Sequence, residues 1–366
     1  MKDIMTIPLF EAYPALEKQL PWMHLGNWPT PVQKLSNLGK AIGHENLWIK
    51  RDDLSSDIYG GNKVRKLEFI IPDALRKKKK YMITVGGIGT NSGLSTTIHC
   101  GRAGIKTVLL LVPQPITQNV QENLLLDQYF GAEINVFHGQ PEAYLRVAWV
   151  LLTHPNFYLL WAGGTSPFST ISYVNAVLEL KRQIDGGLLP APKYIFSAVG
   201  SMGTTAGLIV GARLAGLKSH NVGVKVSMDS YSNFKGTVSL ANKTARLMRK
   251  LDPSVPEMKF TAADFDLELN YYGGEYGRVT PEGKAAVDLM KETEGIKLET
   301  TYTGKTLAAM LDFVKNNRSL NGAPVLFWNT HNSVDYSETI KRCGGLKTLP
   351  ECAQWVFKEN LIPYLK

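Results

Sequence analysis

Cysteine is scarce in this sequence of 366 residues, and the cysteines that are present lie far apart. Cys100, Cys343 and Cys352 form no C-x-x-C pair, so the pattern predicts neither a disulfide framework nor a zinc site. We therefore expect no metal centre, and we expect the protein to work in a reducing compartment such as the cytoplasm.

Long hydrophobic runs are also missing. A membrane-spanning helix needs about 20 apolar residues, whereas the run "TVLLLV" (107–112) has the length of a buried strand. The opening segment "MKDIMTIPLFEAYPALEKQL" carries charges and prolines where a signal peptide has an apolar run. The sequence thus predicts a soluble cytoplasmic protein with no membrane partner.

Positive charge is concentrated in one short run. The formal net charge is +9, and "RKKKK" (76–80) supplies much of it. This run follows an apolar helical stretch and has no aromatic residues spaced for base stacking. It therefore predicts a solvated helix end, and we expect no nucleic-acid partner.

The chain does contain a regular alternation of short apolar runs and helical patterns. The runs that predict strands cover residues 46–50, 81–85, 107–112, 134–137, 157–161, 194–199, 224–228 and 325–329. Segments such as "GLSTTIHCGRAG", "QENLLLDQYFG" and "GLIVGARLAG" predict helices that end at glycine. This alternation predicts an α/β fold whose parallel sheets are covered on both faces. We expect the strands from 81 to 161 to form one sheet and those from 194 onward a second.

The first of three glycine-rich turns is "IYGGNKVRKLEF" (58–69), which places Lys63 at the start of a predicted helix. Asn62 is a suitable N-cap, and Pro72 is expected to end this helix or to begin the next one. A helix N-terminus disfavours a cation, so nothing local stabilises a charged Lys63. Two interpretations remain: a plain surface turn, or a lysine that binds an anionic cofactor covalently.

The second turn runs from Gly86 to Gly93 and leads from a strand into a helix. Its glycine spacing is close to a dinucleotide fingerprint, but the following strand ends in "LLLVPQP" without the acidic residue that holds a ribose. Thr90, Asn91 and Ser92 place hydroxyl and amide groups at the helix start. Such a position binds anions, including carboxylates.

The third turn, Gly200-Ser201-Met202-Gly203-Thr204, also joins a strand to a helix, which is expected from about Thr205. Backbone N–H groups and hydroxyls at a helix N-terminus can hold a phosphate. The turn lacks the Gly-Lys-Ser/Thr ending of a nucleotide P-loop, so a nucleoside triphosphate is not expected. The alternative is that small residues merely let the helix pack closely on its sheet.

Together these turns resemble the pyridoxal-phosphate (PLP) enzymes of the tryptophan-synthase-β fold type. More narrowly, the chain is similar to the family of D-cysteine desulfhydrases and 1-aminocyclopropane-1-carboxylate (ACC) deaminases. The segments that carry the resemblance are "KRDDL" (50–54) with "GGNKVRKLEF" (60–69), "GGIGTNS" (86–92), "GSMGTTAGL" (200–208), "EYGRVTPEGKAAVDLMKETEGIKLETTYTGKTLAAML" (275–311) and "VLFWNT" (325–330). The similarity extends from about Leu25 to Thr330 and beyond.

The resemblance implies a fold and an assembly. It implies two three-layer domains with mostly parallel twisted sheets and with PLP in the cleft between them. Residues 1–62 and 175–366 would form the large PLP-binding domain, and residues 63–174 the small substrate-side domain. A homodimer acting on a small amino acid is expected.

The resemblance also implies roles for individual residues. Lys63 would form the Schiff base with the cofactor and take the α-proton of the substrate. Catalytic roles would fall to Lys63, Thr90, Tyr276 and Tyr302, and substrate contacts to Thr90, Asn91 and Ser92. The cofactor would be contacted by Lys63, Asn62, Lys66, Asn91, Gly200, Ser201, Met202, Gly203, Thr204, Tyr302, Thr303 and Thr330. Among these, Lys66 and the backbone of 200–204 would hold the phosphate.

Three departures from the family pattern lie close to the expected substrate. Thr303 stands where ACC deaminases carry an acid, so we expect Thr303 or Thr330, and no carboxylate, to face the pyridine nitrogen. Gly89 replaces a glutamine and removes a side chain that could face the substrate. "NTHNS" (329–333) stands where the family has "HTGG". His331 is expected to be structural, as a lone histidine in a late loop usually is, and His99 is expected to pack near the second turn.

The function predicted from the sequence is an α,β-elimination of the D-cysteine desulfhydrase type, which yields a 2-oxo acid, ammonia and sulfide. An ACC deaminase or another PLP-dependent amino-acid enzyme, such as a racemase-like variant, is the alternative within the class. Outside it stand a nicotinamide-dependent oxidoreductase, which Lys63 and the missing ribose acid disfavour, and a non-catalytic PLP-binding protein.

Overall fold

The computed structural model describes residues 6–137, 140–317, 320 and 322–358. The chain forms two compact units. The first consists of Met1–Phe69 and Ser166–Ser333, and the second of Ile70–Thr165 and Val334–Lys366. The predicted division kept all of 175–366 in one domain, whereas the segment from Val334 onward clusters with the second unit. Residues 1–5 and 359–366 of the predicted ranges lie outside the described residues.

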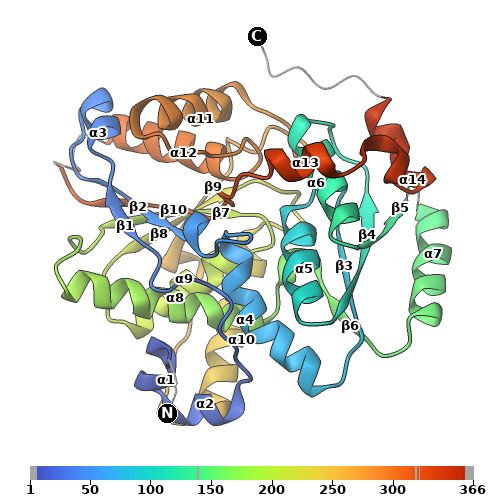
Figure 1. Ribbon diagram of the computed structural model, residues 1–366. Helices are drawn as coiled ribbons and strands as arrows, with labels where there is room; N and C mark the ends of the chain where they lie inside the picture. Colours follow the sequence, from blue (N-terminus) through green and yellow to red (C-terminus); the bar gives the residue numbers. More distant parts are fainter. Residues whose placement is uncertain (1–5, 138–139, 318–319, 321, 359–366) are drawn as a thin grey trace. The chain divides into compact units, whose positions relative to one another are not determined.

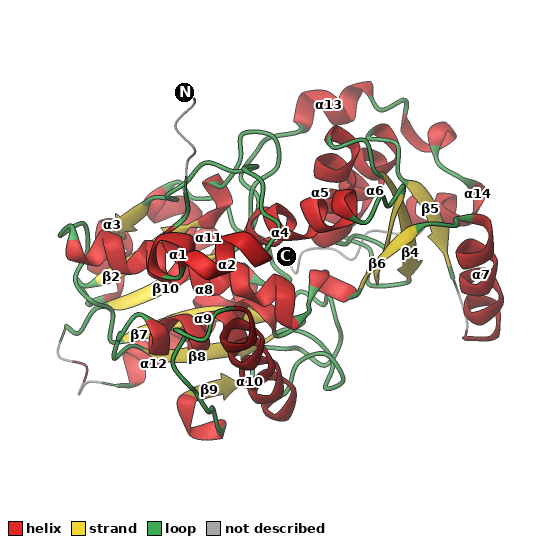
Figure 2. Cartoon of the chain, turned by 90° about the horizontal axis from the view of Figure 1, so that it is seen from below, coloured by secondary structure: helices red, strands yellow, loops and turns green. Residues whose placement is uncertain are grey.

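The first unit is built on a six-stranded sheet with the strand order β1-β2-β10-β7-β8-β9. Figure 2 shows β2, β10, β7, β8 and β9 following one another in this order. The strands are β1 (Val32–Lys34), β2 (Leu47–Arg51), β7 (Tyr194–Val199), β8 (His220–Lys225), β9 (Phe265–Glu268) and β10 (Val325–Asn329). Strand β1 pairs antiparallel with β2, and all other pairs are parallel.

Helices cover both faces of this sheet, as predicted. In Figure 1, α11 and α12 lie on one side of the sheet and α8 and α9 on the other. The helices of this unit are α1 (Pro8–Ala12), α2 (Pro14–Gln19), α3 (Ser36–Ile42), α8 (Pro167–Asp185), α9 (Gly203–Leu214), α10 (Phe234–Leu251), α11 (Pro281–Glu294) and α12 (Thr303–Asn316), with single turns η1 (Asp52–Leu54) and η3 (Ala262–Asp264).

The central strand β10 shows why the sheet is covered on both faces. Side chains alternate across a strand, so Val325 and Phe327 pack with α12 residues such as Leu307. Leu326 and Trp328 point to the other face and pack with residues of α8 and α9. A strand that is buried on both faces reads as a continuous apolar run, which is how "VLFW" appears in the sequence.

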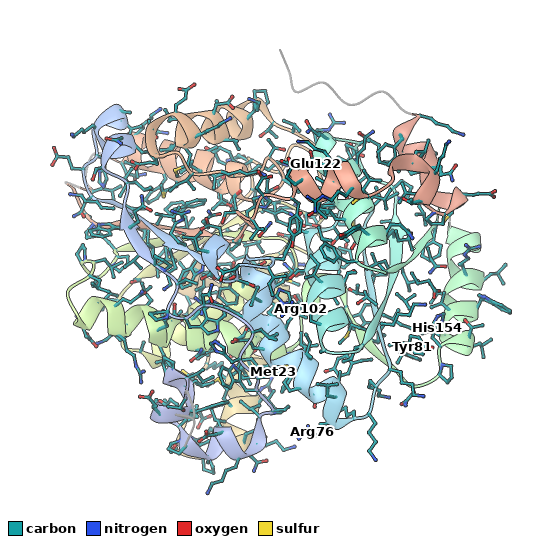
Figure 3. The ribbon with its side chains drawn as sticks, viewed as in Figure 1. Met23, Arg76, Tyr81, Arg102, Glu122 and His154 are labelled. Carbon is teal, nitrogen blue, oxygen red and sulfur yellow. The ribbon has the colours of Figure 1, made fainter. Side chains whose placement is uncertain are left out.

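The second unit contains a four-stranded parallel sheet with the order β5-β4-β3-β6. Its strands are β3 (Tyr81–Gly87), β4 (Lys106–Val112), β5 (Glu133–Val136) and β6 (Phe157–Leu160). Its helices are α5 (Asn91–Arg102), α6 (Gln118–Tyr129), α7 (Gln140–Thr153), α13 (Ser337–Arg342) and α14 (Glu351–Gln354), with single turns η2 (Ala162–Gly164), η5 (Gly345–Thr348) and η6 (Trp355–Phe357). Near the end of α7, the rings of His154 and Tyr81 meet edge to face with centroids 4.8 Å apart (Figure 3).

Most of the predicted elements are confirmed. The strands from 81 to 161 form one sheet, and those from 194 onward belong to the other. The predicted strand 224–228 is shifted, since β8 ends at Lys225, and the short strands β1 and β9 were not predicted. Helices α5, α6 and α9 are each followed by a left-handed glycine, namely Gly104, Gly131 and Gly216. Helix α9 begins at Gly203, slightly earlier than expected.

The prediction that Pro72 ends this helix or begins the next one is wrong, because α4 (Asn62–Arg76) continues through it. A proline in a helix leaves the carbonyl four residues earlier without its usual N–H donor. Here that carbonyl belongs to Glu68, and it accepts a hydrogen bond from the Met23 backbone N–H at 2.9 Å. Figure 3 labels Met23 beside α4. The substitute donor removes much of the energetic reason for the helix to stop.

The basic run behaves as predicted. Arg76 and Lys77 each form an ion pair with Asp73 one turn earlier, and both basic side chains are exposed. They therefore form a solvated helix end. No helix among the described residues has both the length and the apolar character needed to cross a membrane.

Candidate functional site

Lys63 is the second residue of α4 and is partly buried. Its Nζ donates a hydrogen bond to the Asn62 Oδ1 at 3.0 Å. The Asn62 Nδ2 in turn donates to the Thr204 Oγ1 at 3.1 Å. Asn62 thus links Lys63 directly to the third glycine-rich turn, where Thr204 lies 142 residues after Asn62 in the sequence.

The loop that precedes Lys63 lies against the segment that follows β10. The Asn62 N–H donates to the Thr330 carbonyl at 3.1 Å, and the Gly60 N–H donates to the Asn332 Oδ1 at 2.7 Å. Gly61 has a φ of +95°, and a Cβ on it would lie only 2.8 Å from the Thr330 carbonyl oxygen. Only glycine allows both this conformation and this approach.

The third turn, 200–204, follows β7 and opens α9. Met202, the residue before α9, has a left-handed φ of 65°, and its side chain does not cap the helix. The Tyr302 ring lies over the turn, because a Cβ on Gly200 would be 3.0 Å from the Tyr302 Cε1. A helix N-terminus without a side-chain cap has N–H groups available for an anion.

Two lysines share this part of the first unit. Burial lowers the pKa of Lys63 to about 8. Lys66 is only 2% exposed, and burial together with the charge of Lys63 lowers its pKa well below the usual value. Two cations desolvated side by side are favoured when an anion is bound between them. The residues present therefore fit a phosphate-bearing cofactor, with Lys63, Lys66 and the turn 200–204 as the groups that could hold it.

Two tyrosines form a hydrogen-bonded pair in the same unit. The Tyr276 and Tyr302 hydroxyl oxygens are 2.5 Å apart. Burial raises the pKa of Tyr276 to about 12. Burial, followed by the neighbouring Tyr276, raises the pKa of Tyr302 as well. Both phenols are consequently neutral near pH 7.

Glu299 organises the start of α12, where Tyr302 and Thr303 lie. Its Oε1 accepts hydrogen bonds from the backbone N–H groups of Tyr302 (2.8 Å) and Thr303 (2.7 Å), and its Oε2 accepts one from the N–H of Thr301 (2.7 Å). The Thr303 Oγ1 contacts the same carboxylate at 3.1 Å. An acid at a helix N-terminus is stabilising. Glu299 was not among the predicted site residues, although an acid shortly before a predicted helix is a recognisable signal.

Thr90, Asn91 and Ser92 meet at the start of α5 in the second unit. The Thr90 Oγ1 accepts a hydrogen bond from the Gly93 N–H at 3.3 Å and caps the helix. The Asn91 Oδ1 accepts one from the Asn123 Nδ2 at 2.8 Å, and the Ser92 Oγ is buried with no partner among the described residues. Asn123, which was not predicted, holds this loop from α6.

The interpretation of Gly89 needs correction. A Cβ at this position would lie 2.5 Å from the Val120 Cγ2 and 2.8 Å from the Val120 Cα. A side chain at 89 would therefore collide with α6. Glycine here is required by packing against α6, which is a stronger reason than the removal of a substrate contact. His99 is a helix residue, as predicted, and it is buried on α5.

Comparison with known proteins agrees with this arrangement. Residues 23–330 match the family described as pyridoxal-phosphate dependent enzyme. A D-cysteine desulfhydrase of Yersinia enterocolitica is 33% identical over 85% of this chain and 94% of its own length. A protein of Pyrococcus furiosus named as a 1-aminocyclopropane-1-carboxylate deaminase is 31% identical over 86% of this chain and 93% of its own length.

Solved structures of similar proteins superpose on this chain. A structure described as an ACC deaminase homologue superposes with a TM-score of 0.74 and 29% identity, covering 93% of this chain and 100% of the other. An L-serine ammonia-lyase from the fungus Rhizomucor miehei has a TM-score of 0.58 and 15% identity, covering 88% and 98% of the two chains, and it supports the fold alone. The resemblance, the fold class and the cofactor that the motifs predicted are confirmed. This chain belongs to the family of pyridoxal-phosphate dependent enzymes.

Proposed function

We propose that this protein is a PLP-dependent lyase that removes a β-leaving group from a small amino acid, with D-cysteine as the preferred type of substrate. The products would be a 2-oxo acid, ammonia and, from D-cysteine, sulfide. The observation that carries the proposal is the position of Lys63, a lysine of lowered pKa that Asn62 ties to the phosphate-binding type of turn at Thr204. The similarity to a named D-cysteine desulfhydrase supports the choice of reaction.

Lys63 would have two tasks in this reaction. It would bind the cofactor covalently through Nζ, and after release it would take the proton from the substrate Cα. A base works best when its pKa is near the working pH, and burial brings the pKa of Lys63 from 10.5 to about 8. When bound, PLP supplies the electron sink that makes this Cα proton acidic.

The other predicted site residues would bind and orient. We assign the phosphate to Lys66 and the turn 200–204, and further cofactor contacts to Asn62, Asn91 and Tyr302. We assign the substrate carboxylate to the start of α5, where Thr90, Asn91 and Ser92 lie with backbone N–H groups at a helix N-terminus. Tyr276 and Tyr302 would hold a proton at a fixed place beside the reacting groups.

Thr303 supports desulfhydrase over ACC deaminase chemistry. We propose that Thr303 or Thr330 faces the pyridine nitrogen and that no carboxylate does. Glu299, the acid four residues earlier, binds three backbone N–H groups of its own segment. A neutral partner keeps the ring nitrogen less positive and the electron sink weaker. Thiolate and chloride leave readily under those conditions, whereas the cyclopropane ring of ACC needs a stronger sink.

We also propose that the protein is a cytoplasmic homodimer. The domain roles that we propose keep the predicted division of labour but place Lys63, which the predicted bounds assigned to the small domain, in the cofactor-binding unit. The unit that contains Lys63 and the turn 200–204 binds the cofactor, and the unit that contains Thr90, Asn91 and Ser92 binds the substrate. Light scattering of the purified protein tests the dimer.

An assay of ammonia and 2-oxo acid tests the reaction. The panel is D-cysteine, L-cysteine, D-serine, β-chloro-D-alanine and ACC, each with the PLP-loaded enzyme. We expect D-cysteine and β-chloro-D-alanine to be the best substrates. Turnover of ACC well above that of D-cysteine would favour the deaminase alternative, and no turnover of any compound would contradict the proposed function.

A further inference from the structure

Two neighbouring polar side chains at the end of β10 have unused hydrogen-bonding atoms. The Nδ2 of Asn329 and the Nδ1 of His331 are both buried, and neither has a hydrogen-bond partner among the described residues. Asn329 is 0% exposed and His331 is 7% exposed. Buried polar atoms without partners are rare in native proteins because each loses its water without compensation. Two of them on residues i and i+2 indicate a place where a ligand supplies the missing partner.

The backbone beside these two side chains lies against the loop that leads into Lys63. The Thr330 carbonyl accepts the Asn62 N–H, and a Cβ on Gly61 would be 3.2 Å from the His331 carbonyl oxygen. Gly61 precedes Lys63 by two residues. The His331 backbone therefore packs against the loop that carries Lys63.

The loop is fixed without using the imidazole. The Asn332 Oδ1 accepts the Gly60 N–H at 2.7 Å, and the His331 N–H donates to the Asn329 Oδ1 at 3.3 Å. The hydroxyl of Ser333 donates to the Asp53 carbonyl at 3.0 Å. Because these bonds already hold the backbone, the Nδ1 of His331 has no structural task among the described residues.

The His331 imidazole is neutral near pH 7. Burial lowers the pKa of His331 to about 4, with Glu299 opposing and Lys297 assisting this shift. A neutral imidazole offers one donor and one acceptor nitrogen, so it can pair with an uncharged polar group. It does not attract a charged substrate side chain as an imidazolium would.

We infer that His331 is a specificity-determining residue whose Nδ1 forms a hydrogen bond with an uncharged polar group on the substrate side chain. The substrate class is thereby narrowed to small amino acids that carry a hydroxyl, thiol or similar group at the β-position. This inference rests on the proposed function, because it places the amino-acid substrate next to Lys63. It replaces the expectation that His331 is merely structural.

The inference is tested by binding of two amino acids of equal size. D-serine carries a hydroxyl where D-2-aminobutyrate carries a methyl group, and D-2-aminobutyrate has no β-leaving group. The dissociation constants of both, and of their L-enantiomers, are measured on the PLP-loaded enzyme at low temperature, from the change in cofactor absorbance. We expect the wild type to bind serine about 10- to 100-fold more tightly than 2-aminobutyrate.

Two substitutions at the same position separate recognition from structure. In His331→Leu the ratio of the dissociation constants of 2-aminobutyrate and serine should fall to about one. The affinity for 2-aminobutyrate should stay within about threefold of wild type. His331→Asn keeps a polar atom near the position of Nδ1 and should retain part of the preference. His220→Leu, which changes a half-exposed surface histidine, is the matched control and should leave the preference unchanged.

The outcomes are distinguishable. If the wild type and His331→Leu show the same preference, or if His331→Leu weakens both ligands equally, His331 is structural and the inference is wrong. If the PLP-loaded wild type binds none of the four compounds, the proposed class of substrate fails, and the inference fails with it.

Discussion

The hydroxyl oxygens of Tyr276 and Tyr302 lie 2.5 Å apart, so one phenol donates its proton to the other. The pKa of Tyr276 is raised to about 12, and the pKa of Tyr302 is raised too. Neither phenol is therefore an anionic base near neutral pH. The pair can instead hold one donated proton at a fixed position, while the Tyr302 ring lies over Gly200.

Removal of either hydroxyl tests whether the pair acts as a unit. We expect Tyr276→Phe and Tyr302→Phe each to lower kcat by about 100-fold, in the range of a positioned proton donor. The double variant should lose little more than the worse single variant, because residues that act together are not additive. Cofactor absorbance should persist in all three.

Steady-state kinetics of the three variants provide the measurement. Tyr231→Phe, at a tyrosine that is 43% exposed, is the control and should retain wild-type rates. Independent, multiplicative losses in the double variant would show that the two hydroxyls do not work as one pair.

The lowered pKa of Lys63 predicts how cofactor capture depends on pH. Only the neutral amine attacks the PLP aldehyde, and burial moves the pKa of Lys63 down from 10.5 to about 8. The neutral fraction of Lys63 is thus about one half at pH 8 and about nine-tenths one pH unit higher. The rate at which apoenzyme captures PLP should rise about tenfold per pH unit below pH 8 and then level off.

Stopped-flow absorbance after mixing apoenzyme with PLP measures this rate. Free lysine is the reference, and its rate should keep rising toward pH 10. A capture rate for the enzyme that also rises through pH 10 would mean that Lys63 retains an ordinary pKa.

A buried ion network anchors the start of α4. The Glu179 Oε1 accepts hydrogen bonds from Lys50 at 2.5 Å and from Arg65 at 2.9 Å, while Arg65 also pairs with Asp52 at 2.7 Å. All four side chains are at most 5% exposed. Replacement of Glu179 by Gln leaves buried positive charge uncompensated and should cost about 3–5 kcal/mol of unfolding free energy at pH 7.

The same network gives a pH signature. The positive neighbours lower the pKa of Glu179 from 4.5 to about 2. Its contribution is therefore fully present above about pH 4.5 and is lost as the pH falls toward 2. Urea unfolding at pH 7, 4 and 3 should show the gap between wild type and Glu179→Gln narrowing as the pH falls. Glu11→Gln, at an exposed pair with Arg182, should change little.

Local patterns predicted much of the fold. Strands that are buried on both faces, such as β10, are recognisable in the sequence as continuous apolar runs. The ends of helices such as α5 are marked by a glycine in the left-handed conformation. The strands that escaped prediction are β1 and β9, with three and four residues. The helix end predicted at Pro72 was wrong because the effect of this proline depends on Met23. Met23 lies 49 residues earlier in the sequence, and its backbone N–H supplies the replacement donor.

The candidate site was predictable where its chemistry is local. Lys63, Asn91 and the turn 200–204 sit in short motifs whose spacing is set by the chemistry. Asn123 belongs to another helix and reaches Asn91 only through the tertiary fold, so no pattern marks it. The unused nitrogen of His331 was equally hidden, because burial and missing partners are properties of the packed structure.

Borohydride reduction of the PLP-loaded protein tests the central claim most directly. The protein should be yellow before reduction, and its absorbance near the border of visible and ultraviolet light should be lost on treatment. Peptide mapping by mass spectrometry should then find the reduced pyridoxyl group on Lys63, and Lys63→Ala should carry none. A pyridoxyl group on Lys66 or on any other lysine, or no labelled lysine at all, would contradict the account.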